Sequence, residues 1–422
     1  MVAILGYSRE QITSAVQDMY TAVADHPDAH FHFPVGTSAS ALVGYPPERI
    51  APLPRAVKES FAGVGNPFNA EAVERGDTVL DIGAGAGVDT LIAGRLAGPE
   101  GHVIALDLTP AMARKLQRAT GESGGAPVSV IQGSAEALPL ANGSLDSITS
   151  NGALNLVPDK RRAIGEMFRV LRPGGRLQIA DVVIDRPVTV DCAEDPRLWV
   201  ECVVGATVEE DLLNMFRDAG FEDVRVLGSK DYFAHSPSRQ TREVAAGFGA
   251  RSVELAMRRG DRRPSRLRQT LRRLSPKRIA ASLWRRGFVG MLGLAVALLA
   301  CYGTLAAVAL LAMLGVGLAL DEGIWAGTIA LFAVLTAFAI VPGARRHGGF
   351  GPSILAGAGA GAIVYALFVD YRLWIELVGF AALATAVLWD IRLRRLQQAR
   401  MLGLAGARGA GPRDPKPRSR AE

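Results

Sequence analysis

Cysteine is scarce in this sequence of 422 residues, which contains only Cys192, Cys202 and Cys301. Three cysteines are too few for a disulfide framework, which excludes the small disulfide-stabilised secreted proteins and predicts reduced thiols. The N-terminus also lacks a charged stretch followed by an apolar core, so we expect no cleaved leader peptide.

Charge is scarce in four stretches in the C-terminal part of the chain: residues 288–320, 323–344 and 347–369 contain no Asp, Glu, Lys or Arg, and residues 373–389 contain only Glu376. Each is near or above the length of about 20 residues that a helix needs to cross a bilayer. Arginines precede the first stretch and follow the second and the fourth, whereas Asp321, Glu322, Asp370 and Arg372 lie in the other two connections. The positive-inside rule then predicts four membrane-spanning helices, with both termini in the cytoplasm.

Acidic residues are rare between Arg251 and Arg286, where thirteen arginines and lysines face only Glu254 and Asp261. This stretch alone outweighs the net charge of +6. Because it precedes a predicted span, we interpret it as a juxtamembrane segment attracted to anionic lipid rather than as a nucleic-acid-binding surface. A solvated linker is the alternative.

Glycine, by contrast, is patterned, and the pentapeptide GAGAG occurs at 83–87 and again at 357–361. The first copy follows an apolar run at Thr78–Ile82 that contains Asp81, and it opens into a helical pattern from Val88. A second apolar run ends at Asp107. Strand, glycine loop, helix, strand and acid in this order predict a nucleotide-binding unit. Asp89, in the first turn of that helix, is interpreted as a helix-start residue.

The words "VLDIGAGAGVD", "GSAEALPLANGSLDSITSNGALNLVPDK" and "EMFRVLRPGGRLQIADVV" resemble class I S-adenosylmethionine-dependent methyltransferases. The resemblance implies a Rossmann-like α/β domain with a seven-strand, mostly parallel sheet, and S-adenosylmethionine as cofactor. It also implies that Asn151, at the end of the fourth strand, lies beside the transferred methyl group. The implied cofactor contacts are Asp81, Gly83, Ala84, Gly85 and Gly87 for the methionine part, Asp107 for the ribose, and Ser134, Ala135 and Glu136 for the adenine.

Two further words, "AGVGNPF" at 62–68 and "LWVECVVGATVEEDLLNMFRDAGFEDVRV" at 198–226, resemble the arsenite methyltransferases. In that family cysteine thiolates bind As(III), a soft ion suited to sulfur. Cys202 matches one of these cysteines, whereas Val64 and Gly152 stand at the positions of the others. The resemblance assigns Cys202, with Asn151, to catalysis, and Cys202 with Cys192 to the metalloid; a small buried Cys202 without a ligand role is the alternative.

The second GAGAG has no strand before it and lies in an apolar stretch, "GPSILAGAGAGAIVYALFVDY". We predict that Gly357 and Gly361 let two membrane helices approach closely. This half of the chain resembles the four-span mercuric-ion transport proteins of the MerC type, in which a cysteine pair acts in the first span. Here Cys301 is followed by Thr304 rather than by a second cysteine, and a plain membrane anchor is the alternative.

Together these observations predict a methyltransferase in the bacterial inner membrane, arsenite methyltransferase-like, with a small-molecule or metalloid acceptor and no nucleic-acid partner. The alternatives are methylation of a small organic or lipid-like acceptor, and a transport or sensing module with a non-catalytic nucleotide fold. The expected domains are an N-terminal helical region (1–50), the methyltransferase domain (51–258), a basic linker (259–287), four transmembrane helices (288–392) and a disordered basic tail (393–422).

Overall fold

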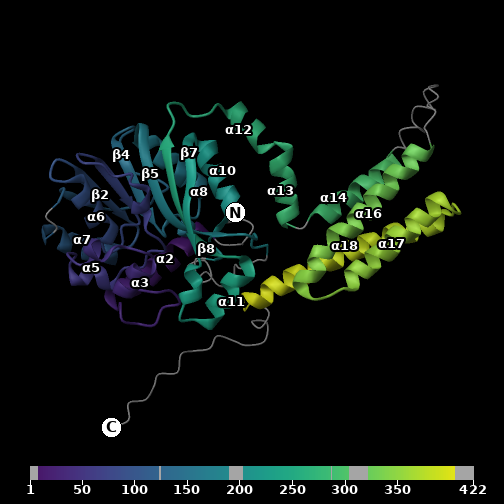
Figure 1. The fold of residues 1–422 in the computed structure, drawn as a ribbon, viewed down its shortest axis with the longest axis horizontal. Helices are drawn as coiled ribbons and strands as arrows, with labels where there is room; N and C mark the ends of the chain where they lie inside the picture. The colour runs from purple at the N-terminus through teal and green to yellow at the C-terminus, as the bar shows by residue number, and fades with distance from the viewer. Residues whose placement is uncertain (1–7, 123–124, 190–202, 287, 304–321, 404–422) are drawn as a thin grey trace, which may run out of the picture. The chain divides into compact units, whose positions relative to one another are not determined.

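The computed structural model of the chain describes residues 8–122, 125–189, 203–286, 288–303 and 322–403. The chain divides into two compact units, Met1–Arg273 and Leu274–Glu422 (Figure 1). Each unit has an apolar core of its own. The boundary between the units falls inside the stretch that was expected to be a basic linker.

A mixed β-sheet forms the centre of the first unit (Figure 1). Its strands lie in the order β3-β2-β1-β4-β5-β8-β7, and the short β6 pairs with β5. All pairs are parallel except the two that β8 makes. The predicted seven-strand, mostly parallel sheet is therefore confirmed, with the two-residue β6 as an addition. The strands are β1 Thr78–Ile82, β2 His102–Asp107, β3 Val128–Gln132, β4 Leu145–Asn151, β5 Leu171–Ile184, β6 Thr207–Val208, β7 Phe221–Lys230 and β8 Arg251–Arg259.

Helices accompany this sheet, and the purple N-terminal helices α2, α3 and α5 gather beside it in Figure 1. The expected helical character of the N-terminal region is confirmed for its described residues by α2 to α4. The longer helices of the unit are α2 Arg9–Asp25, α6 Val88–Ala97, α7 Pro110–Ala119, α8 Lys160–Val170, α10 Glu209–Ala219, α11 Arg239–Phe248 and α12 Arg266–Arg273. The shorter ones are α3 Thr37–Leu42, α4 Pro47–Ile50, α5 Arg55–Glu59 and the 3₁₀ turns η1 Pro67–Ala70, η2 Thr120–Glu122, η3 Leu154–Leu156 and η4 Tyr232–His235.

Side chains alternate between the two faces of the sheet along each strand, and one of these faces packs on the apolar core. Leu80, Ile148 and Ile179 lie on adjacent strands and join one buried cluster with Phe168 of α8 and Phe216 of α10. Successive side chains of a strand point to opposite faces of a sheet. The next residue of β1, Asp81, therefore lies on the face away from this core.

The second unit is built of helices, namely α13 Pro276–Arg286, α14 Val289–Leu298, the π-helical turn η5 Leu299–Gly303, α16 Glu322–His347, α17 Gly351–Phe368 and α18 Leu373–Met401. Among the described residues, three segments are long and apolar enough to span a membrane: Trp325–Arg345, Gly351–Phe368 and Leu373–Met401. Val289–Gly303 is a shorter apolar helix. Residues 304–320 of the expected first span lie outside the described residues, so the count of four spans stays a prediction.

The close helix contact expected from the second GAGAG is made by a different glycine. A Cβ atom added to Gly359 would lie 2.8 Å from the carbonyl oxygen of Gly379, whereas one added to Gly357 or Gly361 would meet nothing within 4 Å. The prediction that Gly357 and Gly361 form the contact is therefore wrong. The repeat does pack helices, but α17 turns its middle glycine toward α18.

Two expected boundaries also differ from the structure. Residues 259–287, expected to be a linker, contain the helices α12 and α13. Helix α18 continues to Met401, so residues 393–401, expected in a disordered tail, are helical. Residues 404–422 of that tail lie outside the described part of the chain.

Candidate functional site

A cavity of about 360 Å³ lies at the carboxyl ends of β1, β2 and β4. These three strands are neighbours and parallel, so their carboxyl ends meet at one edge of the sheet. This edge is where ligands bind in open α/β sheets. The cavity is lined by Asn151, which was predicted to be catalytic, and by most of the predicted cofactor residues: Gly83, Ala84, Gly85, Gly87, Asp107, Ser134, Ala135 and Glu136.

The glycine loop connects β1 to the start of α6, and hydrogen bonds to β2 hold it in place. The amides of Gly83 and Ala84 donate to the carbonyl oxygen of Leu106 at 2.8 and 3.1 Å. Gly87 has φ +108, and a Cβ there would lie 2.2 Å from Leu116 Cδ1. Glycine is thus required at Gly87 both by the backbone conformation and by the space.

Asp81, the one predicted cofactor residue that does not line the cavity, is fully buried near the end of β1. Its Oδ2 accepts a hydrogen bond from Thr90 Oγ1 at 2.6 Å, whereas its Oδ1 has no partner among the described residues. Burial, and then the nearby carboxylate of Asp89, raise the pKa of Asp81 well above its ordinary value. A buried oxygen left without a donor fits a site that receives a donor or a positive charge from a ligand.

Asp107, at the end of β2, ties the glycine loop to the strand. Its Oδ2 accepts from the amide of Gly85 at 2.8 Å and its Oδ1 from the amide of Thr109 at 2.7 Å. Burial raises the pKa of this carboxyl group, and the two amide donors act against that shift. The carboxylate lines the cavity and retains acceptor capacity, as a ribose-binding acid would require.

The other end of the cavity is formed by Ser134, Ala135 and Glu136 together with helix α2. Glu136 forms an ion pair with Arg9 of α2 and accepts from the amide of Asp159 at 2.7 Å. Four further residues of α2 line the cavity: Ile12, Thr13, Val16 and Tyr20. Sequence reasoning assigned no site residue to α2, and its buried Ile12 and Val16, four residues apart, are the only local signal of a face that covers something.

Asn151 is placed at the end of β4, as predicted, and all of its hydrogen-bonding capacity is used. Its two Nδ2 hydrogens are shared among three acceptors, Asp89 Oδ2 at 3.0 Å, Tyr45 Oη at 3.0 Å and the carbonyl oxygen of Gly65 at 2.8 Å. Its Oδ1 accepts from the amides of Val64 and Gly65. Asn151 therefore fixes the backbone of residues 64 and 65 to the end of β4, and its predicted place beside the methyl group stays a prediction.

Asp89 belongs to the site, although the sequence indicated only a helix-start residue. It lies in the first turn of α6, yet it is buried, lines the cavity and accepts a hydrogen bond from the hydroxyl of Tyr45. Burial raises its pKa to about 6. Nothing local distinguishes this acid from a solvated helix-start acid, because its partners come from residues far away in the chain.

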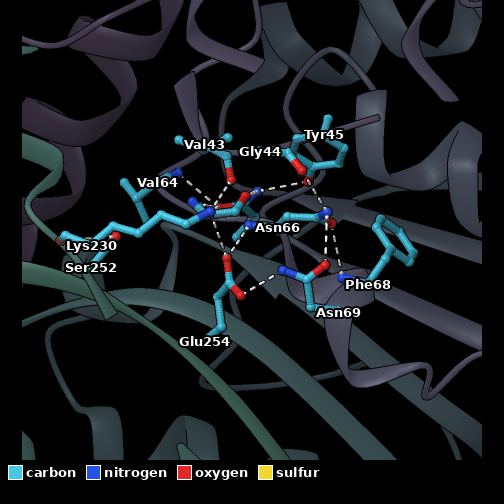
Figure 2. A network of polar contacts seen from close by, with 12 residues as sticks. Val43, Gly44, Tyr45, Val64, Asn66, Phe68, Asn69, Lys230, Ser252 and Glu254 are labelled. Atoms are coloured by element: carbon cyan, nitrogen blue, oxygen red, sulfur yellow. Dashed lines mark hydrogen bonds and ion pairs between the residues drawn. The ribbon is translucent and has the colours of Figure 1, made fainter. Parts of the chain in front are cut away.

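A second polar network fixes the loop before η1. This loop contains most of the segment "AGVGNPF". Figure 2 shows the backbone amide of Asn66 and the side-chain amide of Asn69 directed at the carboxylate of Glu254. Glu254 Oε1 accepts from the Asn66 amide at 3.0 Å, and its Oε2 accepts from Asn69 Nδ2 at 2.7 Å. Lys230 Nζ lies 3.4 Å from Glu254 Oε1 and donates to the carbonyl of Val43 at 2.6 Å. The carboxylate thus anchors this loop to β8.

Val64 and Gly152, the two positions that lack an expected cysteine, are neighbours in space. A Cβ added to Gly152 would lie 3.3 Å from Val64 Cγ1, and Gly152 has φ +71. Val64 is buried, so an apolar contact occupies the place where thiolates were sought. Cys192 and Cys202 lie outside the described residues, and the described part of the chain holds no group of three His, Cys, Asp or Glu side chains suited to a metal ion.

In the second unit, Cys301 is a buried free thiol in η5. Its Sγ donates to Glu376 Oε1 of α18 at 2.8 Å. Thr304, the position at which a second cysteine was sought, lies outside the described residues. The thiol therefore has a carboxylate, rather than another thiol, as its observed partner.

Comparisons with known proteins agree with this architecture. Residues 73–220 match the family model of a methyltransferase domain, and residues 288–392 match that of the MerC mercury resistance protein. The arsenite methyltransferase of Halobacterium salinarum is 39% identical over 189 residues, which cover 45% of this chain and 48% of that protein. The ubiquinone/menaquinone biosynthesis C-methyltransferase of Yersinia pestis is 34% identical over 178 residues, which cover 37% of this chain and 70% of that protein.

Among solved structures, the arsenic(III) S-adenosylmethionine methyltransferase of Chlamydomonas reinhardtii has 34% sequence identity and a TM-score of 0.45, covering 51% of this chain and 74% of that one. The sheet, the glycine loop and the acid that follows it are those of a methyltransferase. The chain belongs to the S-adenosylmethionine-dependent methyltransferases, with relatives among the quinone-biosynthesis and arsenite methyltransferases, and its C-terminal part matches the MerC family model. The chain spans about half the length of the Halobacterium protein that it matches.

The residues present fit the cofactor of this family. Asp81 leaves one buried oxygen without a donor, Asp107 lines the cavity beside the loop, and the loop glycines leave the backbone accessible. S-adenosylmethionine carries an ammonium group, which suits Asp81, and a ribose, which suits Asp107. When bound, the cofactor supplies an electrophilic methyl group on a positively charged sulfur.

Proposed function

We propose that the chain is a membrane-anchored methyltransferase that uses S-adenosylmethionine. The observation that carries this proposal is the cavity at the ends of β1, β2 and β4, with its glycine loop and Asp107. In this role the loop backbone and Asp81 hold the methionine part, Asp107 the ribose, and Ser134 to Glu136 the adenine edge. Helix α2 covers the cavity and would exclude water from the reacting groups.

We further propose that the first acceptor to test is arsenite. The proposal rests on the arsenite methyltransferase relatives and on Cys202, which matches a thiolate position of that family. The As(III) lone pair would attack the methyl carbon, and the carbon–sulfur bond electrons would remain on the cofactor sulfur. Cys202 would be a ligand, with Cys192 as its candidate partner.

A second acceptor class is favoured by one contact. Val64 packs against Gly152 at the positions of the family's other thiolates, so hydrocarbon rather than sulfur occupies these positions. A soft metalloid gains little from hydrocarbon, whereas a small organic acceptor can bury apolar surface against it. We therefore hold a small organic or lipid-like acceptor as the alternative.

The experiment uses the full chain in lipid nanodiscs with methyl-labelled S-adenosylmethionine, arsenite and excess glutathione, and it measures cofactor binding in the same sample. Labelled methylarsenicals that disappear in Cys202→Ser would support the arsenite proposal. Cofactor binding without an arsenic product, followed by labelling of material from a lipid extract, would support the organic acceptor. A chain that binds no cofactor would contradict the methyltransferase proposal itself.

We also propose that the catalytic unit lies on the cytoplasmic side of the inner membrane. The distribution of arginines around the apolar helices supports this orientation, as does the match to a MerC-type module. Protease treatment of right-side-out and inverted vesicles tests it. Cleavage of the methyltransferase unit only in inverted vesicles is expected, and cleavage only in right-side-out vesicles would contradict the orientation.

A further inference from the structure

The loop end of the cavity is acidic and its other end holds the basic residues. Asp81, Asp89 and Asp107 are all buried around the glycine loop. The two arginines that line the cavity, Arg9 and Arg162, both contact Glu136 at the opposite end, Arg9 through an ion pair and Arg162 through its Nε to the Glu136 carbonyl at 2.8 Å. A ligand in this cavity therefore meets negative charge at the loop end.

Among these acids, Asp89 is the one joined to Asn151, at the strand end where the methyl group is predicted. Its Oδ2 lies 3.0 Å from Asn151 Nδ2, and its Oδ1 accepts from the hydroxyl of Tyr45. Each oxygen has one donor, and a carboxylate can accept about four hydrogen bonds in total. Two neutral donors orient the group without cancelling its charge, so the carboxylate stays available to a cation in the cavity.

We propose that Asp89 is the counter-ion of the cofactor's sulfonium, and that it makes the site prefer the charged cofactor over the neutral product. This inference rests on the proposed methyltransferase function. When the methyl group leaves for the acceptor, the electron pair of the carbon–sulfur bond remains on sulfur, and the sulfonium becomes a neutral thioether. The ammonium and carboxylate of the methionine part are the same before and after the reaction. The two ligands thus differ by one unit of charge at sulfur.

The physical basis is that a buried carboxylate attracts a cation much more strongly than a solvated one, because the surrounding dielectric is low. The attraction ends when the sulfur loses its charge. Asp89 would therefore help to retain the cofactor before the reaction and to release the product after it. Asp81 and Asp107 would act less on this difference, because the proposed function assigns them to the methionine part and the ribose, which are the same before and after the reaction.

The test is calorimetric binding of three ligands to the full chain in nanodiscs: S-adenosylmethionine, S-adenosylhomocysteine and sinefungin, in which a protonated amine replaces the methylsulfonium. Asp89→Asn should weaken the two cationic ligands by about tenfold or more and leave S-adenosylhomocysteine within about twofold. Tyr45→Phe is the matched control, because it removes a donor to Asp89 but keeps the carboxylate. It should retain the preference for the cationic ligands.

The binding ratio should also depend on pH. Burial raises the pKa of Asp89 to about 6. The titratable groups that face it are Tyr45 and Asp81, and Asp107 at the end of β2 acts on Asp81 in turn. Protonation below this pKa removes the charge, so the preference for sinefungin over S-adenosylhomocysteine should shrink as the pH falls from about 7.5 to about 5.5. Asp89→Asn should show a weaker dependence.

The outcomes separate this inference from the function on which it rests. Equal losses for all three ligands in Asp89→Asn would mean that the carboxylate serves a group that they share, and would overturn the inference while leaving the methyltransferase proposal intact. Unchanged binding of all three would overturn it as well. A wild-type chain that binds none of them would overturn both proposals.

Discussion

At the scale of single residues, the carboxylates around the glycine loop are costly in the absence of a ligand. Asp81 and Asp89 are buried and lie near one another, and each raises the free energy of the other's charged form. Such groups are common where a protein binds a cation or performs chemistry. Their cost is visible as a dependence of stability on pH.

The pH dependence has a definite sign for Asp89. Its pKa is about 6 in the folded chain against an ordinary value of 3.8, so the folded state holds the proton more tightly. The free energy of unfolding should therefore fall as the pH rises from about 4 to about 6, and Asp89→Asn should lack this part of the fall. Urea unfolding of the methyltransferase unit in the ligand-free full chain, measured across this range, would show it. Parallel curves for the two proteins would contradict the assignment.

Glu254 offers a second residue-scale prediction, because it is a buried charge with three partners in Figure 2. Glu254→Ala removes the acceptor of the Asn66 backbone amide and of Asn69 Nδ2, and the ion-pair partner of Lys230, and should lower the free energy of unfolding by about 2 to 4 kcal/mol. Glu243→Ala is the control, because its ion pair with Arg239 is exposed. It should cost less than about 1 kcal/mol. Equal losses measured by chemical unfolding would argue against the anchoring role.

At the scale of elements, the contact between α17 and α18 depends on one glycine. Gly359→Leu would drive a side chain into the carbonyl of Gly379, whereas Gly357→Leu would enter open space. We expect the first variant to unfold at a lower mole fraction of SDS, with a free energy of unfolding lower by more than about 1 kcal/mol. The second variant should behave as the wild type. Circular dichroism in mixed micelles measures both. If Gly357→Leu were the more disruptive, the observed register of α17 would be wrong.

The sequence predicted those elements whose defining residues are consecutive, and it missed those that depend on residues far apart in the chain. The strand, loop and helix around the first GAGAG were predicted correctly, because Asp81, the glycines and Val88 follow one another directly. The second copy lies in a helix that is apolar all round, so no polar face indicated that Gly359 would point inward. Asp89 and α2 were missed because Tyr45, Asn151 and Glu136 reach them from distant parts of the chain.

At the scale of the whole molecule, each of the two units has its own apolar core. All residues that line the cavity and all members of the sheet core belong to Met1–Arg273. A chain cut after Arg273 should therefore remain soluble without detergent and bind S-adenosylmethionine within about threefold of the full chain. Gel filtration and calorimetry test this. An aggregated product, or one that folds without binding, would mean that the membrane unit completes the site.

The two copies of GAGAG make different demands on chirality. Gly85 has φ +55, whereas residues 357–361 lie within the right-handed helix α17. A Cβ added to Gly85 or to Gly357 meets nothing within 4 Å, so available space does not distinguish the two positions. The hand of the backbone does, because an L side chain opposes the conformation at Gly85 and suits that at Gly357. A D-alanine introduced by chemical synthesis would reverse both preferences, so glycine serves at Gly85 as the coded substitute for a mirror-image residue.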